Sequence, residues 1–274
     1  MDHRGADRCV GLAMMQRVAM GVEYNGAGFC GWQSQPNQGG VQDALEQALQ
    51  AISGHVVRVH AAGRTDTGVH ALSQVVHFDT HAARPISAWV RGVNAFLPDT
   101  VRVLWAQEVD ATFHARFSAT QRSYQYLLAN QACAPAIQHD RVGWYHLPLD
   151  VPAMQQAANY LLGEHDFSAF RASECQAKSP IKTLQLADVK QAQPYIVFAF
   201  SANAFLQHQV RNMVGALIYI GNGKHPPAHI MALLSEKDRT KSPPTFSPNG
   251  LYLSGVGYAE HWGLPITHRQ VTLI

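Results

Sequence analysis

The segment Gly63-Arg64-Thr65-Asp66-Thr67-Gly68 is the first place where residue types and spacing suggest chemistry. Apolar stretches flank it, so it connects two expected strands. Glycines let a backbone come close to a ligand. Asp66 could act there as a nucleophile, with Arg64 as a cation near a phosphate or a base. The alternative is an ordinary turn in which Asp66 bonds its own backbone, because Asp and Gly are common turn residues.

A second segment, Phe113-His114-Ala115-Arg116-Phe117-Ser118-Ala119-Thr120, mixes aromatic rings, an arginine and small polar residues. Aromatic side chains can stack on bases while an arginine contacts phosphate, so this mixture suits RNA. The alternative is a linker between two domains, with its phenylalanines buried in the adjacent cores.

A third segment, Gln207 to Gly215, begins an expected helix with polar residues. Arg211 follows Gln207 by four residues and His208 by three, so these three side chains share one helix face. An arginine among apolar neighbours needs an anionic partner when it is buried, and Asp66 would fit. The alternative is an arginine on the solvent-exposed surface of the helix.

Composition excludes several classes of protein. The chain has 274 residues, which suggests about two domains, and 47% apolar residues, which excludes wholesale disorder. A formal charge of +2 does not by itself indicate a polyanion partner. The four cysteines form no C-x-x-C pair, so they indicate thiols in a reducing cytoplasm. We find no apolar run long enough to span a bilayer and no signal peptide, so we expect a cytoplasmic protein.

Motifs for other chemistry are missing from the sequence. Although the chain has 15 histidines, none is spaced as a zinc ligand set, and His77 and His81 fall on a strand and its end. No G-x-S-x-G elbow supports a Ser-His-Asp triad. No glycine-rich nucleotide motif is present either. We therefore expect no metal and no cofactor.

The elements that must position these residues follow from periodicity. Strands are expected at Val18 to Tyr24, around Val57 and Val59, at Gln74 to Phe78 and at Val101 to Trp105. Helices are expected over Val41 to Ile52, which is closed by Gly54, and over Ile86 to Phe96, which stops before Pro98. This β-α-β-β-α-β order is the split βαβ, or ferredoxin-like, arrangement.

The second part of the chain repeats this order. The expected strands are Tyr124 to Leu128, Leu184 to Lys190, Tyr195 to Ser201 and Leu251 to Tyr258, and the expected helices are Met154 to Leu162, Phe205 to Ile220 and Pro227 to Leu234. The sequence therefore predicts an α+β fold of two tandem ferredoxin-like halves. We divide it into a flexible extension (1–15), an N-terminal half with the Asp66 loop (16–112) and a C-terminal half (113–274).

The loop Ala62-Gly63-Arg64-Thr65-Asp66-Thr67-Gly68-Val69-His70 closely resembles the signature of the tRNA pseudouridine synthase A family, the TruA family. The resemblance extends over nearly the whole chain from Arg17. It includes, in order, Glu23-Tyr24-Asn25-Gly26, Phe29-Cys30-Gly31-Trp32-Gln33, Gly92-Val93-Asn94, Leu97-Pro98, Phe113-His114-Ala115-Arg116-Phe117-Ser118-Ala119, Tyr124-Gln125-Tyr126, Leu162-Gly163-Glu164-His165-Asp166-Phe167, Asn203-Ala204-Phe205, Val210-Arg211-Asn212 and Gly250-Leu251-Tyr252-Leu253. Each motif is weak alone, but their joint occurrence in this order is specific.

The resemblance implies an isomerase that converts uridine to pseudouridine at nucleotides 38, 39 and 40 of the tRNA anticodon stem-loop. It further implies two halves whose strands join in one mostly antiparallel sheet, with helices on one face and a central active-site cleft. The family acts as a homodimer without metal or organic cofactor.

By the same resemblance, Asp66 is the essential carboxylate, Tyr124 packs on the target base, and Arg211 pairs with Asp66. Leu251 lines the uracil pocket, and Arg64 contacts the RNA. Tyr124 could also take the proton from carbon 5. The further RNA contacts that we expect are Phe113, His114, Arg116, Phe117, Lys178 and Lys182.

Two other classes stay open on the sequence alone. A non-catalytic ferredoxin-like RNA-binding module would bind RNA without needing Asp66, Tyr124 and Arg211 together. A nucleoside or glycoside hydrolase would need a second carboxylate as an acid, which the Asp66 loop does not offer.

Overall fold

The computed structural model describes residues 15–36, 39–265 and 267–272. The predicted flexible extension therefore lies outside the described residues except for Met15. The strands are β1 (Gln16–Tyr24), β2 (His60–Ala61), β3 (His70–Thr80), β4 (Val101–Val109), β5 (Ala119–Asn130), β6 (Gly143–Tyr145), β7 (Gly163–Asp166), β8 (Ile181–Ala192), β9 (Tyr195–Ala202) and β10 (Leu251–Tyr258). The α-helices are α1 (Val41–Ser53), α2 (Val93–Phe96), α3 (Val151–Asn159), α4 (Gln209–Gly221) and α5 (His229–Glu236).

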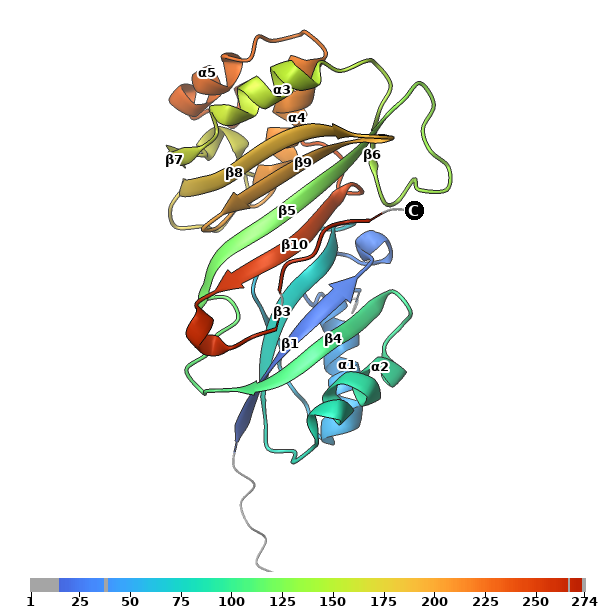
Figure 1. The fold of residues 1–274 in the computed structure, drawn as a ribbon. Helices are drawn as coiled ribbons and strands as arrows, with labels where there is room; N and C mark the ends of the chain where they lie inside the picture. Colours follow the sequence, from blue (N-terminus) through green and yellow to red (C-terminus); the bar gives the residue numbers. More distant parts are fainter. Residues whose placement is uncertain (1–14, 37–38, 266, 273–274) are drawn as a thin grey trace, which may run out of the picture.

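The strands form one ten-stranded sheet, as the family resemblance predicts. Its main path is β4-β1-β3-β10-β5-β9-β8-β7, with β2 paired to β3 and β6 paired to β5. Figure 1 shows the strands in front, with α1 and α2 behind β1 and β4 and with α3, α4 and α5 gathered at the other half. The predicted α+β fold of two ferredoxin-like halves is confirmed.

The two halves use the same strand order. In the N-terminal half β4, β1 and β3 are adjacent and β2 pairs with β3, and in the C-terminal half the order is β10-β5-β9-β8. Each half therefore places its fourth strand beside its first, and its second beside its third. The connections between second and third strands differ. Residues 62–69 separate β2 from β3, whereas only Gln193 and Pro194 separate β8 from β9.

The halves join where β3 meets β10. The two strands are parallel, with Tyr252 opposite His70 and Leu253 opposite Ala71. Strand β1 pairs along one edge of β3, so β2 and β10 share the opposite edge. On that edge β2 pairs with Val76 and His77 of β3. The loop from β2 to β3, which carries Asp66, therefore emerges at the junction between the halves.

His70 fastens this junction. Its Nδ1 accepts a hydrogen bond from the backbone N–H of Gly26 at 3.0 Å, and its Nε2 lies 2.9 Å from the carbonyl oxygens of Asp140 and Asn249. The imidazole ring also stacks on Tyr252 of β10, with centroids 4.6 Å apart. One buried side chain therefore ties the start of β3 to segments from both halves.

Each half has its own apolar core between sheet and helices. Leu45, Ala48 and Leu49 on α1 are buried at the expected spacing, and Gly54 ends the helix in a left-handed conformation with φ 78°. In the C-terminal half, α4 buries Met213, Leu217 and their neighbours against β9 and β5. No helix of the described residues is long and apolar enough to cross a membrane.

Some predicted boundaries were wrong. The second strand is only His60–Ala61. Val57 and Val59 lie before it and pair with no strand, but their side chains are buried in the core, which explains their apolar pattern. The long helix begins at Gln209 and not at Phe205, because His208 has a left-handed backbone that interrupts it. Two short strands, β6 and β7, were not expected from the sequence.

The halves are not independent packing units. Phe113 and Ala115, which follow β4, are fully buried in the N-terminal core, as is Leu253 of β10. The division at residues 112 and 113 stays a prediction.

His77 on β3 is a buried histidine that makes stability depend on pH. It is 2% exposed, and its Nδ1 accepts a hydrogen bond from the backbone N–H of Ala115 at 3.1 Å. Burial, with further lowering by nearby His114, Arg17 and His60, lowers the pKa of His77 from 6.5 to about 3. The folded protein therefore keeps His77 neutral at pH values where the unfolded chain binds a proton.

We expect the free energy of unfolding to fall as the pH drops below 6.5, by about 1.4 kcal/mol per pH unit from His77 alone. The His77→Gln variant keeps an acceptor for the backbone N–H of Ala115 but has no titrating ring. Its free energy of unfolding should therefore fall less between pH 6.5 and 4.5 than that of the parent. Urea unfolding at several pH values measures this. The exposed His146→Gln change is the control, and equal pH slopes for the parent and His77→Gln would contradict the assignment.

Candidate active site

The loop between β2 and β3 holds Asp66 on a fixed backbone. The carbonyl of Thr65 accepts a hydrogen bond from the backbone N–H of Trp32 at 3.0 Å, and its hydroxyl bonds the phenol of Tyr24 at 2.8 Å. The amide of Gln74 donates to the carbonyl of Gly63 at 2.7 Å. These bonds fix the residues on both sides of Arg64 and next to Asp66, so a buried scaffold presents the two charged side chains.

Two glycines are required for this loop. Gly68 has φ 78°, a left-handed conformation that residues with a Cβ rarely adopt. Gly31 has φ 85°, and a Cβ there would lie 2.8 Å from the carbonyl oxygen of Thr65. Both the turn and the close approach of a second segment therefore depend on glycine.

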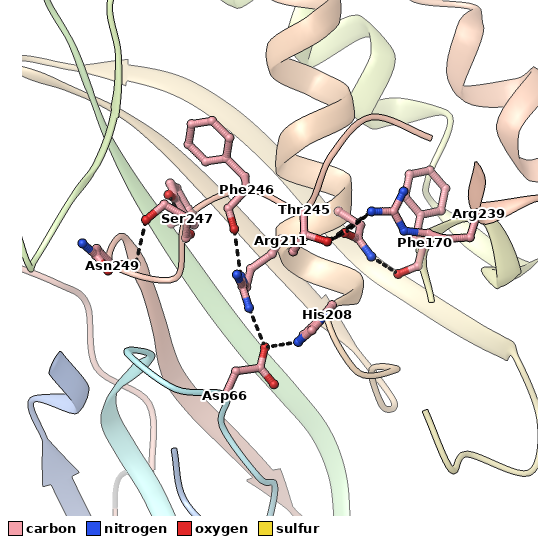
Figure 2. Close-up of polar contacts among 11 residues, drawn as sticks. Asp66, Phe170, His208, Arg211, Arg239, Thr245, Phe246, Ser247 and Asn249 are labelled. Atoms are coloured by element: carbon pink, nitrogen blue, oxygen red, sulfur yellow. Dashed lines mark hydrogen bonds and ion pairs between the residues drawn. The ribbon is translucent and has the colours of Figure 1, made fainter. Parts of the chain in front are cut away.

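Arg211 of α4 reaches across the junction to Asp66. Its Nη1 donates to Oδ2 of Asp66 at 3.1 Å, and its Nε donates to the carbonyl of Phe246 at 2.9 Å (Figure 2). The side chains are 14% and 25% exposed, so water screens this pair only partly. The structure brings together the two charges that the sequence analysis paired, one from each half.

His208 also lies against Asp66, which the sequence analysis did not predict. Its Nε2 is 3.4 Å from Oδ2 of Asp66, the oxygen that Arg211 binds (Figure 2). The available signal was the spacing, because His208 precedes Arg211 by three residues and the expected helix would have placed both on one face, although the observed helix begins only at Gln209. Oδ1 of Asp66 accepts no hydrogen bond from the described residues, so it is left for a substrate.

Tyr124 lies on β5, next to the Asp66 loop. Its ring packs edge-on against Phe205, with centroids 5.2 Å apart, and Gly63 lies opposite its hydroxyl. Burial, reinforced by Tyr24 and Asp66, raises the pKa of the Tyr124 phenol, which therefore stays protonated at neutral pH. This environment favours packing on a base over proton abstraction.

A cleft of about 1410 Å³ surrounds these residues and is lined by both halves. Its walls include Asp66, Tyr124, Arg211 and His208, as well as the buried Leu251 at the start of β10. A cleft of this size exceeds what a single nucleoside needs. It has room for a nucleotide together with adjoining RNA.

Five arginines line the cleft, which compensates for the low net charge of the chain. They are Arg58, Arg64, Arg116, Arg122 and Arg211. Arg64 is exposed and available to a ligand. Arg122 is not, because its guanidinium donates to four backbone carbonyls, those of Ala62, Arg116, Ala119 and Asn203.

The expected RNA contacts divide into two groups. His114, Arg116 and Phe117 line the cleft, whereas Lys178 and Lys182 are not among its lining residues in the described part of the chain. The ammonium of Lys182 donates to the backbone carbonyls of Ser179 and Ile181.

Phe113 and Phe117 have opposite environments. Phe113 is fully buried beside Tyr258 and Trp262, so its ring lies in the core and not in the cleft. Phe117 is 76% exposed, and the guanidinium of Arg116 lies 5.6 Å from the centre of its ring. The Nδ1 of His114 accepts hydrogen bonds from the backbone N–H groups of Arg116 and Phe117 at 3.1 and 3.3 Å. This turn presents an aromatic ring and a cation to the cleft.

The arrangement suits covalent or electrostatic catalysis by a carboxylate. Oδ2 of Asp66 is held by Arg211 and His208, whereas Oδ1 accepts no hydrogen bond from the part of the chain that the structure describes. Among the described residues, no group of three or more His, Cys, Asp or Glu side chains could hold a metal ion.

The chain is similar in sequence to proteins of known family. The chain is 66% identical over 257 residues to the tRNA pseudouridine synthase A of Methylobacillus flagellatus, covering 94% of this chain and 98% of that protein. It is 56% identical over 249 residues to the protein of the same name from Nitrosomonas eutropha, covering 91% and 90%. For the protein from Chromobacterium violaceum the identity is 58% over 250 residues, covering 91% and 95%.

A family profile also matches both halves of the chain. The profile describes tRNA pseudouridine synthases and matches residues 20–118 and 157–259. These ranges contain Asp66, Arg211 and Leu251, whereas Tyr124 falls between them. On this match and on the identities above, the chain belongs to the tRNA pseudouridine synthase family.

Proposed function

We propose that this protein converts uridine to pseudouridine at positions 38, 39 and 40 of the tRNA anticodon stem-loop, with Asp66 as the catalytic carboxylate. Family membership supports the reaction. The observation that carries it is the pair of Asp66 and Arg211, which meet across the two halves beside Tyr124 in an arginine-lined cleft.

The reaction breaks the bond between N1 of uracil and C1′ of the ribose and forms a bond between C5 and the same C1′. Oδ1 of Asp66 is free to attack C1′ or to stabilise positive charge there, as carboxylates do in glycosidases. The bonding electrons leave with N1, the uracil turns, and C5 supplies the pair for the new bond. Where Oδ1 has bonded to C1′, this attack by C5 breaks that bond and releases the carboxylate of Asp66. The proton lost from C5 balances the proton gained at N1.

The detached uracil must stay in place while it turns. Tyr124 packs on one face of the base in this proposal, and the buried Leu251 closes the apolar wall. Stacking on an aromatic ring retains a base of any orientation, because it does not depend on particular hydrogen bonds. The pocket can therefore hold uracil both before and after rotation.

The target uridine must also leave its stack, at roughly a few kcal/mol. Arg64 and Arg116 supply cations at the cleft, and the exposed Phe117 supplies a stacking surface. Lys178 and Lys182, which we expected in the same cleft as Arg64 and Arg116, are not among the described residues that line it, so they carry no part of this proposal. We further propose that the enzyme acts as a homodimer in the cytoplasm, where a second subunit adds cations.

A non-catalytic RNA-binding module is the alternative function. It accounts for the arginines and for Phe117, but it gives no reason to hold a carboxylate inside a cleft meant for a polyanion. Incubation with unmodified tRNA, followed by nucleoside analysis, separates the possibilities. Pseudouridine supports the synthase, binding without product supports the module, and free uracil indicates a hydrolase.

Replacing the carboxylate tests the assignment of Asp66. We expect Asp66→Asn to lower pseudouridine formation by at least about a thousandfold, because an amide is a poor nucleophile and carries no charge. The tRNA dissociation constant should stay close to that of the parent, because phosphate contacts dominate affinity. Asp99→Asn, an exposed site outside the cleft, is the control. Normal turnover by Asp66→Asn would disprove the role.

Removing the partner of Asp66 should damage both activity and stability. We expect Arg211→Ala to lower the free energy of unfolding by about 1–3 kcal/mol, which is less than for a fully buried pair because both side chains are partly exposed. Arg211→Lys should recover activity only in part, since an ammonium cannot bond Asp66 and Phe246 with one planar fork. Denaturant titration and single-turnover assays measure both effects. Unchanged melting and turnover in Arg211→Ala would contradict the pairing.

Salt should weaken tRNA binding steeply, with log affinity falling linearly against log salt concentration. Arg116→Gln should reduce that slope by about one, because one phosphate contact is lost. Arg84→Gln, at an exposed arginine that does not line the cleft, should leave the slope unchanged. Filter binding at several salt concentrations checks both variants. Salt-independent affinity would argue against an arginine-lined RNA site.

A further inference from the structure

The residue before α4 has an unfavourable backbone. His208 has φ 62° and ψ 0°, and among described residues other than glycine only Lys237 also has a positive φ. A Cβ makes this left-handed conformation unfavourable, and such residues persist only where the surroundings hold them. The strain at His208 therefore needs a structural reason.

Helix capping is not that reason. The N-cap residue, which immediately precedes the first turn of a helix, usually has an extended backbone and a side chain that accepts a hydrogen bond from a backbone N–H of that turn. The side chain of His208 makes no such bond. The neighbouring Gln209 satisfies the local backbone, because its Oε1 accepts from the N–H of Leu206 at 2.8 Å. The start of α4 does not need an imidazole.

The preceding residue is fixed by another loop. The carbonyl of Gln207 accepts from the backbone N–H of Ala172 at 3.1 Å, and its N–H donates to the Sγ of Cys175 at 3.5 Å. With Gln207 held from one side and α4 starting on the other, His208 must absorb the change of direction. The ring of His208 points toward Asp66, as Figure 2 shows, and His208 is one of the residues that line the cleft.

The ring meets Asp66 at the same oxygen as Arg211. Nε2 of His208 lies 3.4 Å from Oδ2, and Nη1 of Arg211 lies 3.1 Å from it. Arg211 alone leaves the carboxylate free to rotate about its bond to Cβ. A second contact on Oδ2, from a residue three positions earlier in the chain, restricts that rotation and keeps Oδ1 directed to the open side.

We propose that His208 is a positioning residue for Asp66, and that its left-handed backbone serves to place its ring on Oδ2. The inference rests on the proposed function and deepens it. His208 acts through Asp66 rather than on the substrate, so its loss lowers the rate of the chemical step and leaves tRNA affinity unchanged. Glu174, a second acidic residue that lines the cleft, is exposed, and its carboxylate accepts a hydrogen bond from the hydroxyl of Ser173 at 2.9 Å.

The His208→Gly variant tests this without a folding penalty, because glycine adopts the left-handed backbone freely. We expect its thermal midpoint to equal or exceed that of the parent. The single-turnover rate at saturating unmodified tRNA should fall about tenfold or more, and the dissociation constant should change less than twofold. His208→Gln, which offers a side-chain N–H group in place of the ring nitrogen, should recover part of the rate although it carries the backbone strain.

Lys237→Gly is the matched control. Lys237 has φ 56° at the end of α5 and pairs with Asp166, so this change relieves the same kind of strain outside the cleft. It should leave the rate unchanged. A parent-like rate in His208→Gly, or an equal rate loss in Lys237→Gly, would overturn the inference.

Two further outcomes would decide between the positioning role of His208, a role in RNA binding and a failure of the proposed function. Weaker tRNA binding by His208→Gly with an unchanged rate at saturation would make His208 an RNA contact and overturn its positioning role. A parent that forms no pseudouridine would overturn the proposed function and this inference with it. An active parent with an equally active His208→Gly variant would overturn the inference alone.

Discussion

The ion pair between Asp66 and Arg211 is the interaction on which the arrangement of the cleft depends. Asp66 comes from the N-terminal half and Arg211 from the C-terminal half, and their polar atoms approach to 3.1 Å. A carboxylate in a cleft that attracts polyanions would be disfavoured without a cation beside it. The pair also forms only when the two halves have folded into their correct relative position, so the same contact connects folding to the assembly of the site.

The shared sheet fixes the relative position of the two halves. β3 and β10 join the halves through a short parallel contact, and His70 holds that contact from a buried position. Sheet pairing is rigid compared with the packing of two separate domains, so the distance between Asp66 and α4 is well defined. A catalytic group on a loop gains precision when both ends of the loop enter paired strands.

Local periodicity predicted the elements, and the resemblance predicted how they join. The spacing of apolar residues predicted α1, and the expected closing strand, Leu251 to Tyr258, has the limits of β10. What stayed hidden was non-local or strained. Nothing in the spacing indicates that Phe113 is buried while Phe117 is exposed, since both flank one turn. Likewise, the left-handed backbone at His208 follows a residue, Gln207, that accepts a hydrogen bond from Ala172 and donates one to Cys175, and both of these are distant in sequence.

The two-residue connection between β8 and β9 has a consequence for symmetry. The two halves share one strand order. Two halves related by a pseudo-twofold axis would be expected to carry an equivalent loop between the second and third strands of each half. Gln193 and Pro194 close the second pair with a turn too short to carry a functional loop. Of these two connections, only the one formed by residues 62–69 is long enough to carry a functional loop, so the C-terminal half has no counterpart of the Asp66 loop between its second and third strands.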